Sequence, residues 1–313
     1  MATWMLIAAF GGGILGANVS GVAAFVIVGF IALASGMVGL VSGSLSLSGA
    51  AEYYPYLTNG ADFMMGNMAF GSYIGPHVAF AGAVAAAAYA ANKSKTLDSG
   101  MSITTPIFSL NDPIAMLVGG VFGVLGFLIL HLYANVLAIP TDNVALTVAT
   151  SCIISRFVFG KSGLFGKYTP PAGNPNAPRQ WIPSGNALAN ILILGFGVGL
   201  MVSAVGIHLM ESGVVAVPYV QAFYPPLIFG LAAISLVFAV MGKGVAATHH
   251  IALPAALAAV LSGNLVVGVV VGTVNSLLNE IVGKALNEHS DTFIDPPAVV
   301  IFSSTFVILA MWG

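Results

Sequence analysis

Residues 73–83 read YIGPHVAFAGA, a histidine at the start of a run of small and apolar residues, and our interpretation of the fold begins from this stretch. A related stretch, THHIALPAA, lies at residues 248–256. Each is followed by an Asp-Pro pair that opens a further apolar run, Asp112-Pro113 after the first and Asp295-Pro296 after the second. The repeated order of these motifs predicts an internal duplication.

The composition excludes a water-soluble globular domain. Of the 313 residues, 58% are hydrophobic and only 6% are charged, and the mean hydropathy is +1.00. Soluble domains carry about 25% charged residues on average. The apolar runs are roughly 15–25 residues long without strict alternation, which is the length of membrane-crossing helices and not of barrel strands. We therefore predict an all-α, polytopic helical membrane protein.

The apolar runs predict eight or nine transmembrane helices. They cover residues 4–17, 22–41, 76–91, 113–137, 144–157, 186–210, 226–241, 249–278 and 296–312. The run at 249–278 is too long for one straight span, so we expect it to be tilted or broken near Ser262-Gly263-Asn264. Residues 63–70 are apolar but too short to cross, which favours a re-entrant hairpin or an interfacial helix.

The basic residues indicate how the chain is oriented in the membrane. With the N-terminus outside and nine crossings, all but one of them fall on the cytoplasmic side, as the positive-inside rule requires. The exception in this count is Lys284, which it places outside. The N-terminus lacks the basic segment of a cleaved signal peptide, so we expect the first helix to be retained. We expect a multi-pass protein of a bacterial or archaeal cell membrane.

The duplication divides the chain into two halves. We assign residues 1–140 to the first half, residues 141–185 to a linking helix and a basic loop, and residues 186–313 to the second half. One linking helix reverses the direction of all that follows, so the second half is predicted to be inverted, with a parallel repeat as the alternative. Secondary transporters and several channels are built from inverted repeats with broken helices, and their site lies between the repeats.

The candidate binding residues lie at helix starts and on the approach to them. A proline within an apolar run leaves backbone carbonyls without a donor, and such groups normally line a cavity or bind an ion. Ionisable residues within a membrane are functional candidates by default. The candidates for solute or ion binding are Asn67, Ser72, Tyr73, Pro76, His77 and Asp112 in the first half, and His250, Asn264, Asn275 and Asp295 in the second.

Most of these candidates also have a simpler, structural explanation. Asp followed by Pro is a preferred start for any helix, with Asp as the N-cap and Pro at the first helical position. His77 and His250 could titrate near neutral pH or donate to a solute, and they could equally lie among lipid headgroups. Buried amides at helix–helix contacts most often hold the helices together.

The motifs that are missing argue against an enzyme. The sequence contains no His-Glu-x-x-His, Walker or Gly-x-Ser-x-Gly motif. Its single cysteine, Cys152, excludes an intramolecular disulfide and a cysteine-based metal site. We expect no cofactor, no metal centre and no nucleic-acid partner.

We predict instead an ion-coupled secondary transporter for a small polar solute, with a site between the two halves. Its partners would be the lipid bilayer, the solute and a coupling cation. Two alternatives stay open, a passive channel for a small solute and a membrane-embedded subunit of a larger complex. The 38 glycines provide faces that could pack against a second copy or a partner subunit.

Overall fold

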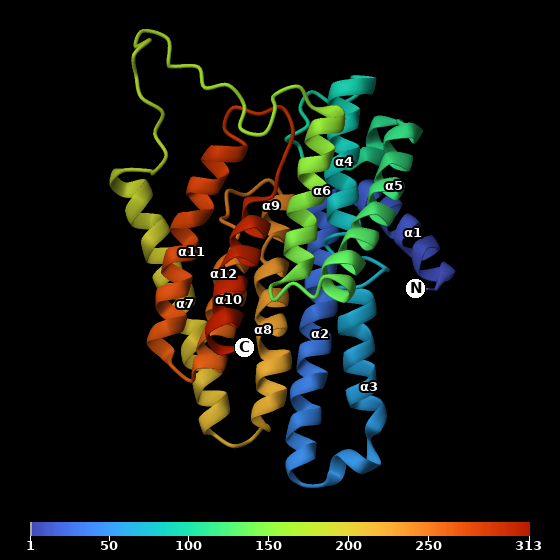
Figure 1. Ribbon diagram of the computed structural model, residues 1–313, viewed down its shortest axis with the longest axis vertical. Helices are drawn as coiled ribbons and strands as arrows, with labels where there is room; N and C mark the ends of the chain where they lie inside the picture. Colours follow the sequence, from blue (N-terminus) through green and yellow to red (C-terminus); the bar gives the residue numbers. More distant parts are fainter. Residues whose placement is uncertain (1) are drawn as a thin grey trace.

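The computed structural model describes residues 2–313, which form a bundle of helices (Figure 1). The α-helices are α1 (Thr3–Val19), α2 (Gly21–Leu47), α3 (Pro55–Phe63), α4 (Ala79–Tyr89), α5 (Pro113–His131), α6 (Asn143–Phe159), α7 (Gly185–Glu211), α8 (Val217–Ile234), α9 (Val237–Val240), α10 (His249–Ser262), α11 (Leu265–Leu286) and α12 (Pro296–Trp312). π-Helical turns extend α3, α4 and α5 over Met64–Ala69, Ala90–Ser94 and Leu132–Val136. The only pairing of β type within residues 2–313 is an isolated bridge between Gly100 and Thr292.

Five helical segments of residues 2–313 are long and apolar enough to cross a membrane. They are Gly21–Leu47, Pro113–Val136, Gly185–Glu211, Val217–Val240 and Leu265–Leu286. Shorter apolar helices accompany them at Thr3–Val19, Asn143–Phe159, His249–Ser262 and Pro296–Trp312. This all-helical architecture is consistent with the predicted helical membrane protein.

The long run at residues 249–278 is broken where the sequence indicates a break. Gly263 ends α10 in the left-handed conformation, with φ at +65°, which glycine adopts without the steric cost of a side chain. The side chain of Asn264 then accepts hydrogen bonds from the backbone N–H groups of Val266 and Val267 and starts α11. The two helices therefore pack side by side as a hairpin.

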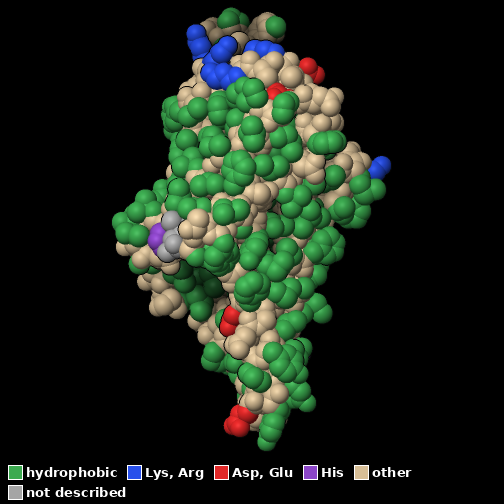
Figure 2. All heavy atoms as spheres, turned by 90° about the vertical axis from the view of Figure 1, so that its right-hand side faces the viewer, with side chains coloured by type: hydrophobic (Ala, Val, Ile, Leu, Met, Phe, Trp, Pro, Cys, Tyr) green, Lys and Arg blue, Asp and Glu red, His purple; other side chains and the backbone are tan. Residues whose placement is uncertain are grey.

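This hairpin places Lys284 at the other end of the molecule from the one predicted. Arg179 donates to the carbonyl oxygen of Lys284, and Arg156 donates to that of Leu286, so the C-terminal end of α11 lies beside the basic loop between α6 and α7. The prediction was wrong because it treated residues 249–278 as one crossing. In Figure 2 most of the visible Lys and Arg side chains gather at this upper end, one lies apart at mid-height, and the charged side chains at the narrow lower end are acidic.

A second difference concerns α8, which begins at Val217 and not at the predicted position 226. Pro225 and Pro226 lie inside this helix. They read as a helix start because proline is favoured there, but membrane helices tolerate internal prolines when neighbouring groups satisfy the freed carbonyls.

Glycines let α2 and α8 approach closely along the centre of the molecule. Gly29 lies against Gly230, and Gly36 lies against Leu227. Further along α2, Gly43 meets Tyr219, which comes earlier in α8, so the two helices run antiparallel. The absence of side chains at these positions brings the backbones together, as in many membrane helix pairs.

Candidate functional site

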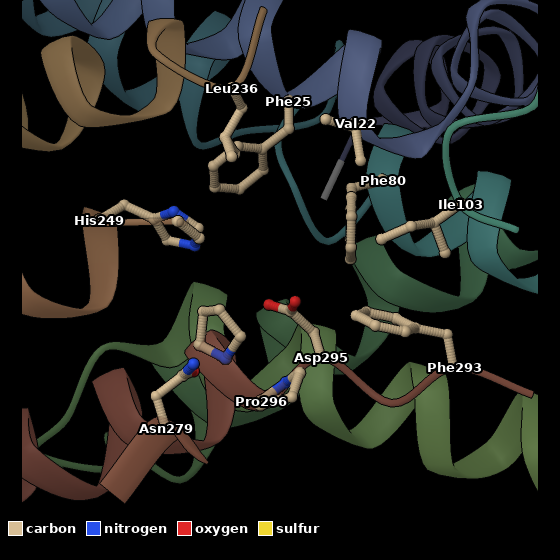
Figure 3. A pocket seen from close by; sticks show the side chains of 12 residues that line it. Val22, Phe25, Phe80, Ile103, Leu236, His249, Asn279, Phe293, Asp295 and Pro296 are labelled. Atoms are coloured by element: carbon tan, nitrogen blue, oxygen red, sulfur yellow. The ribbon is translucent and has the colours of Figure 1, made fainter. Parts of the chain in front are cut away.

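A cavity of about 200 Å³ lies in the interior where α2, α4, α10 and α12 meet (Figure 3). Most of its wall is apolar, and the rings of Phe25, Phe80 and Phe293 form much of it. The carboxylate of Asp295 and the imidazole of His249 point into it (Figure 3). The remaining lining residues are Val22, Ile103, Leu236, Ala247, Asn279, Pro296 and Pro297.

The start of α12 fixes the position of Asp295. Its Oδ2 accepts a hydrogen bond of 3.0 Å from the backbone N–H of Ala298, and two prolines occupy the first helical positions, where no N–H donor is needed. Only 8% of Asp295 is exposed. Within residues 2–313 both ion pairs involve Glu288, so Asp295 has no basic partner. Asp295 is therefore an N-cap, as its simpler explanation states, and its carboxylate also lines the cavity.

A second, smaller cavity of about 30 Å³ adjoins the first and brings Asp142 into the site. It is lined by both Asp142 and Asp295, by His249 and by Pro76, which precedes α4. Asp142 caps α6 as Asp295 caps α12, and its Oδ1 accepts a hydrogen bond of 2.9 Å from Ala145. The other lining residues are apolar: Phe25, Phe70, Val144, Ala145, Val148, Phe229, Ala298 and Ile301.

The three histidines of the two histidine motifs are buried inside the protein and do not lie on its surface. The exposed fraction is 0% for His77, 4% for His249 and 2% for His250, which excludes a place among lipid headgroups. The ring of His249 packs against Phe25 with a centroid distance of 4.7 Å, and its Nδ1 has no hydrogen-bond partner within residues 2–313. Both ring nitrogens of His77 also lack a partner there.

Asn275 holds the start of α10 in place. Its side-chain amide donates to the carbonyl oxygen of His250 at 3.0 Å and to the hydroxyl of Ser304 at 3.1 Å. Pro254 has no N–H to donate to this carbonyl, which lies four residues earlier in α10. The amide of Asn275 supplies the donor in its place and so links α11 to α10. These contacts favour a role for Asn275 in holding the helices together over a role in binding a solute.

Asp112 and Asn264 lie away from the cavity, at helix ends. Asp112 caps α5 through Ala115 and accepts hydrogen bonds from Ser94 and Thr96. Asn264 is exposed and caps α11. Both residues thus act as helix starts.

Three candidates on the approach to α4 belong to other surroundings. Asn67 and Ser72 line a separate cavity of about 520 Å³ together with His131 and Asn135. Tyr73 packs its ring against Trp4, with 6.1 Å between centroids. Of the ten predicted residues, Pro76 and Asp295 therefore line the central cavities. His250 lines neither cavity and is the chain neighbour of His249, which lines both.

The sequence interpretation missed Asp142 as a site residue. The signal was present, because Asp142 precedes Ala145 by three positions at the start of an apolar run, as Asp295 precedes Ala298. The Asp-Pro motif drew attention to Asp112 in its place.

The fold and the cavities define an all-helical protein with five candidate membrane-spanning segments, in which two carboxylates and a histidine line cavities where several helices meet. The chain belongs to the family described as "Family of unknown function (DUF7973)", whose model matches residues 1–173 and 171–313. No curated protein and no solved structure matches it.

Proposed function

We propose that this chain is an ion-coupled secondary transporter of a small polar solute, and that its site lies between two halves of an inverted repeat. The observation that carries the proposal is the pair of adjoining cavities, where carboxylates that start corresponding helices, Asp142 and Asp295, line one space. A site of this kind between repeats is typical of secondary transporters.

The order of helices and their packing support the repeat. In the first half, α5 packs against α1 and α4, and α4 packs against α6. In the second half, α11 packs against α7 and α10, and α10 packs against α12. We therefore assign residues 3–159 and 185–312 to the two halves, each with five membrane segments. In this assignment α6 belongs to the first half and is not a linking helix.

Single contacts recur in corresponding places, which supports the repeat independently of composition. Gly82 of α4 lies against Gly119 of α5. In the second half, Ala255 of α10 lies against Gly268 of α11. These four positions relate α4 to α10 and α5 to α11 in one alignment.

The two histidine motifs fit the same alignment. The carbonyl oxygen of His77 lies against Gly126 of α5, and the carbonyl oxygen of His250 accepts its hydrogen bond from Asn275 of α11. His77 stands five positions before Gly82, and His250 stands five positions before Ala255. Gly126 stands seven positions after Gly119, and Asn275 stands seven positions after Gly268. The correspondence of His77 with His250 is thus supported by packing.

The contacts between α6 and α12 support an inverted relation. The backbone N–H of Asp142 donates to Thr305 Oγ1 at 2.9 Å, and Asp295 lies near Cys152. Cys152 follows Asp142 by ten positions, and Thr305 follows Asp295 by ten. Reciprocal contacts of this kind mark a two-fold axis. Since α6 and α12 run antiparallel, that axis crosses the helices, and Asp142 is the counterpart of Asp295.

The family match adds a boundary that agrees with this division. Its two matched segments meet at residues 171–173, inside the loop that joins α6 to α7. In this arrangement five crossings precede the loop, and an odd number of crossings inverts the half that follows.

Cysteine accessibility tests the inverted relation. Single cysteines at Lys95→Cys, just beyond α4 and its π-helical turn, and at Ser262→Cys, the last residue of α10, are made in a Cys152→Ser background and labelled in intact cells. Because the two positions lie at the C-terminal ends of corresponding helices, we expect a membrane-impermeant reagent to reach them from opposite sides. Labelling of both from the same side would refute the inverted repeat.

Solute uptake into proteoliposomes tests the transport activity. The purified chain is supplied with amino acids, sugars, organic acids and small amines, with and without an imposed H⁺ or Na⁺ gradient. We expect uptake of one class that saturates with concentration and depends on a gradient. Flux that neither saturates nor needs a gradient would identify a channel, and uptake that requires a second protein would identify a subunit; both outcomes overturn the proposal.

A further inference from the structure

We infer that the coupling ion is the proton, and that Asp142, Asp295 and His249 form its binding site. This inference rests on the proposed transport function, and it names the ion that the function requires. The three residues come from α6, α12 and α10 and line the same cavity of about 30 Å³.

Asp295 is buried and Asp142 is partly buried, and neither carboxylate has a compensating charge beside it. One oxygen of each is used by a helix start, Asp142 Oδ1 by Ala145 and Asp295 Oδ2 by Ala298. No side chain within residues 2–313 donates a hydrogen bond to either carboxylate. An ionised carboxylate in such surroundings is costly, and a buried charge is retained only when it binds an opposite one. The site must therefore take up positive charge.

The lining of the small cavity favours a proton over a metal cation. Hard cations are held by about six oxygen ligands. Here the carboxylates and His249 are the only polar side chains, and the rest of the wall is hydrocarbon. Within residues 2–313 no cluster of three His, Cys, Asp or Glu side chains has the geometry to hold a metal ion. A proton needs only one oxygen or nitrogen atom, which each of these side chains provides.

His249 connects the proton site to the larger cavity. It lines both spaces, its imidazole points toward Asp295 in Figure 3, and its Nδ1 is buried without a partner. Imidazole can accept a proton at one nitrogen while it releases one from the other. A proton that leaves the carboxyl group of Asp295 can therefore pass to His249, leaving a carboxylate and an imidazolium, and then to water in the larger cavity.

The neighbouring ionisable groups do not supply a fixed cation to this site. Arg156 of α6 is engaged by carbonyl oxygens at the basic end of the molecule. On α11, Glu280 and Lys284 line a third cavity that shares Asn279 and Pro296 with the larger cavity and no residue with the small one, and Lys284 pairs with Glu288. The sequences of α2 and α12 contain no ionisable side chain. The other ionisable groups on the elements packed around the site are His77, Tyr89, His131, Cys152, Tyr219, Tyr224 and His250.

Infrared difference spectroscopy of the purified protein between acidic and alkaline buffer tests the inference without a known solute. Protonated buried carboxyl groups absorb at a frequency distinct from carboxylates. We expect a pH-dependent carboxyl band that loses intensity in Asp142→Asn and in Asp295→Asn and persists in Asp112→Asn. The control residue is a helix-capping aspartate that lines neither cavity. Asp295→Glu, which keeps the carboxyl group, is expected to restore the band at a shifted position.

Two results would overturn the proton site while leaving transport intact. One is an unchanged band in both asparagine variants, each shown by size-exclusion chromatography to be folded. The other is solute uptake that follows a Na⁺ gradient and is indifferent to a proton gradient. Conversely, the expected band together with a lack of solute uptake would retain the proton site and refute the transporter.

Discussion

The crossing of α2 and α8 offers a sharp test of how the two halves are held together, through Gly230→Ala. A Cβ atom at this position would lie 2.6 Å from the carbonyl oxygen of Gly29 and 2.6 Å from the backbone nitrogen of Leu33. Both neighbours are backbone atoms, so neither can rotate away. The helices must separate, and overpacking of this kind costs about 1–3 kcal/mol.

Alanine also gains helix propensity over glycine, which offsets about 0.5–1 kcal/mol of that cost. We therefore expect Gly230→Ala to lower the thermal stability of the purified protein in detergent, measured as Tm. Gly197→Ala is the matched control, because a Cβ at Gly197 would have no atom within 4 Å outside its own helix, and its Tm should stay equal or rise. If both variants melt together, the close crossing of α2 and α8 is wrong.

Three further predictions concern buried polar contacts and pH. Arg156→Leu removes the donor to the carbonyl oxygen of Leu286 and should cost about 1–3 kcal/mol for each buried acceptor left unpaired, seen as a lower Tm. Asn275→Leu should destabilise by a similar amount, whereas an unchanged Tm would remove its role in holding α10. Burial alone would raise the pKa of Asp291, but hydrogen bonds from Ser162 and nearby backbone N–H groups hold that pKa below its ordinary value. Its contribution to stability is therefore present above the unfolded-state pKa and is lost as pH falls through the folded-state pKa; Asp291→Asn should flatten this acid-side loss in Tm measured against pH.

The sequence was most informative where the composition agrees with the residues that start and end helices. Long apolar runs with few charges specify helices in any membrane context, and the segment Gly263-Asn264 combines the left-handed residue and the cap that a hairpin needs. The same reasoning failed at Pro225 and Pro226. Local preference cannot distinguish a proline that starts a helix from one that its neighbours tolerate inside it.

The site was predicted only in part because it depends on which helix starts meet. Asp112, Asp142 and Asp295 all cap apolar helices and accept from the residue three positions on. Local sequence gives them the same role. Only the packing of α6 against α12 brings Asp142 to Asp295 and leaves Asp112 at another place, among Ser94 and Thr96. That choice is made by contacts between segments far apart in the chain.

The measurement that tests the central claim most directly is solute uptake driven by an imposed proton gradient in proteoliposomes, compared between wild type and single variants. The proposed transporter predicts saturable uptake in wild type and in Asp112→Asn, and loss of the gradient-driven component in Asp142→Asn and Asp295→Asn. Uptake that is the same in all four proteins, or that proceeds without a gradient, would contradict a coupled site between the two halves.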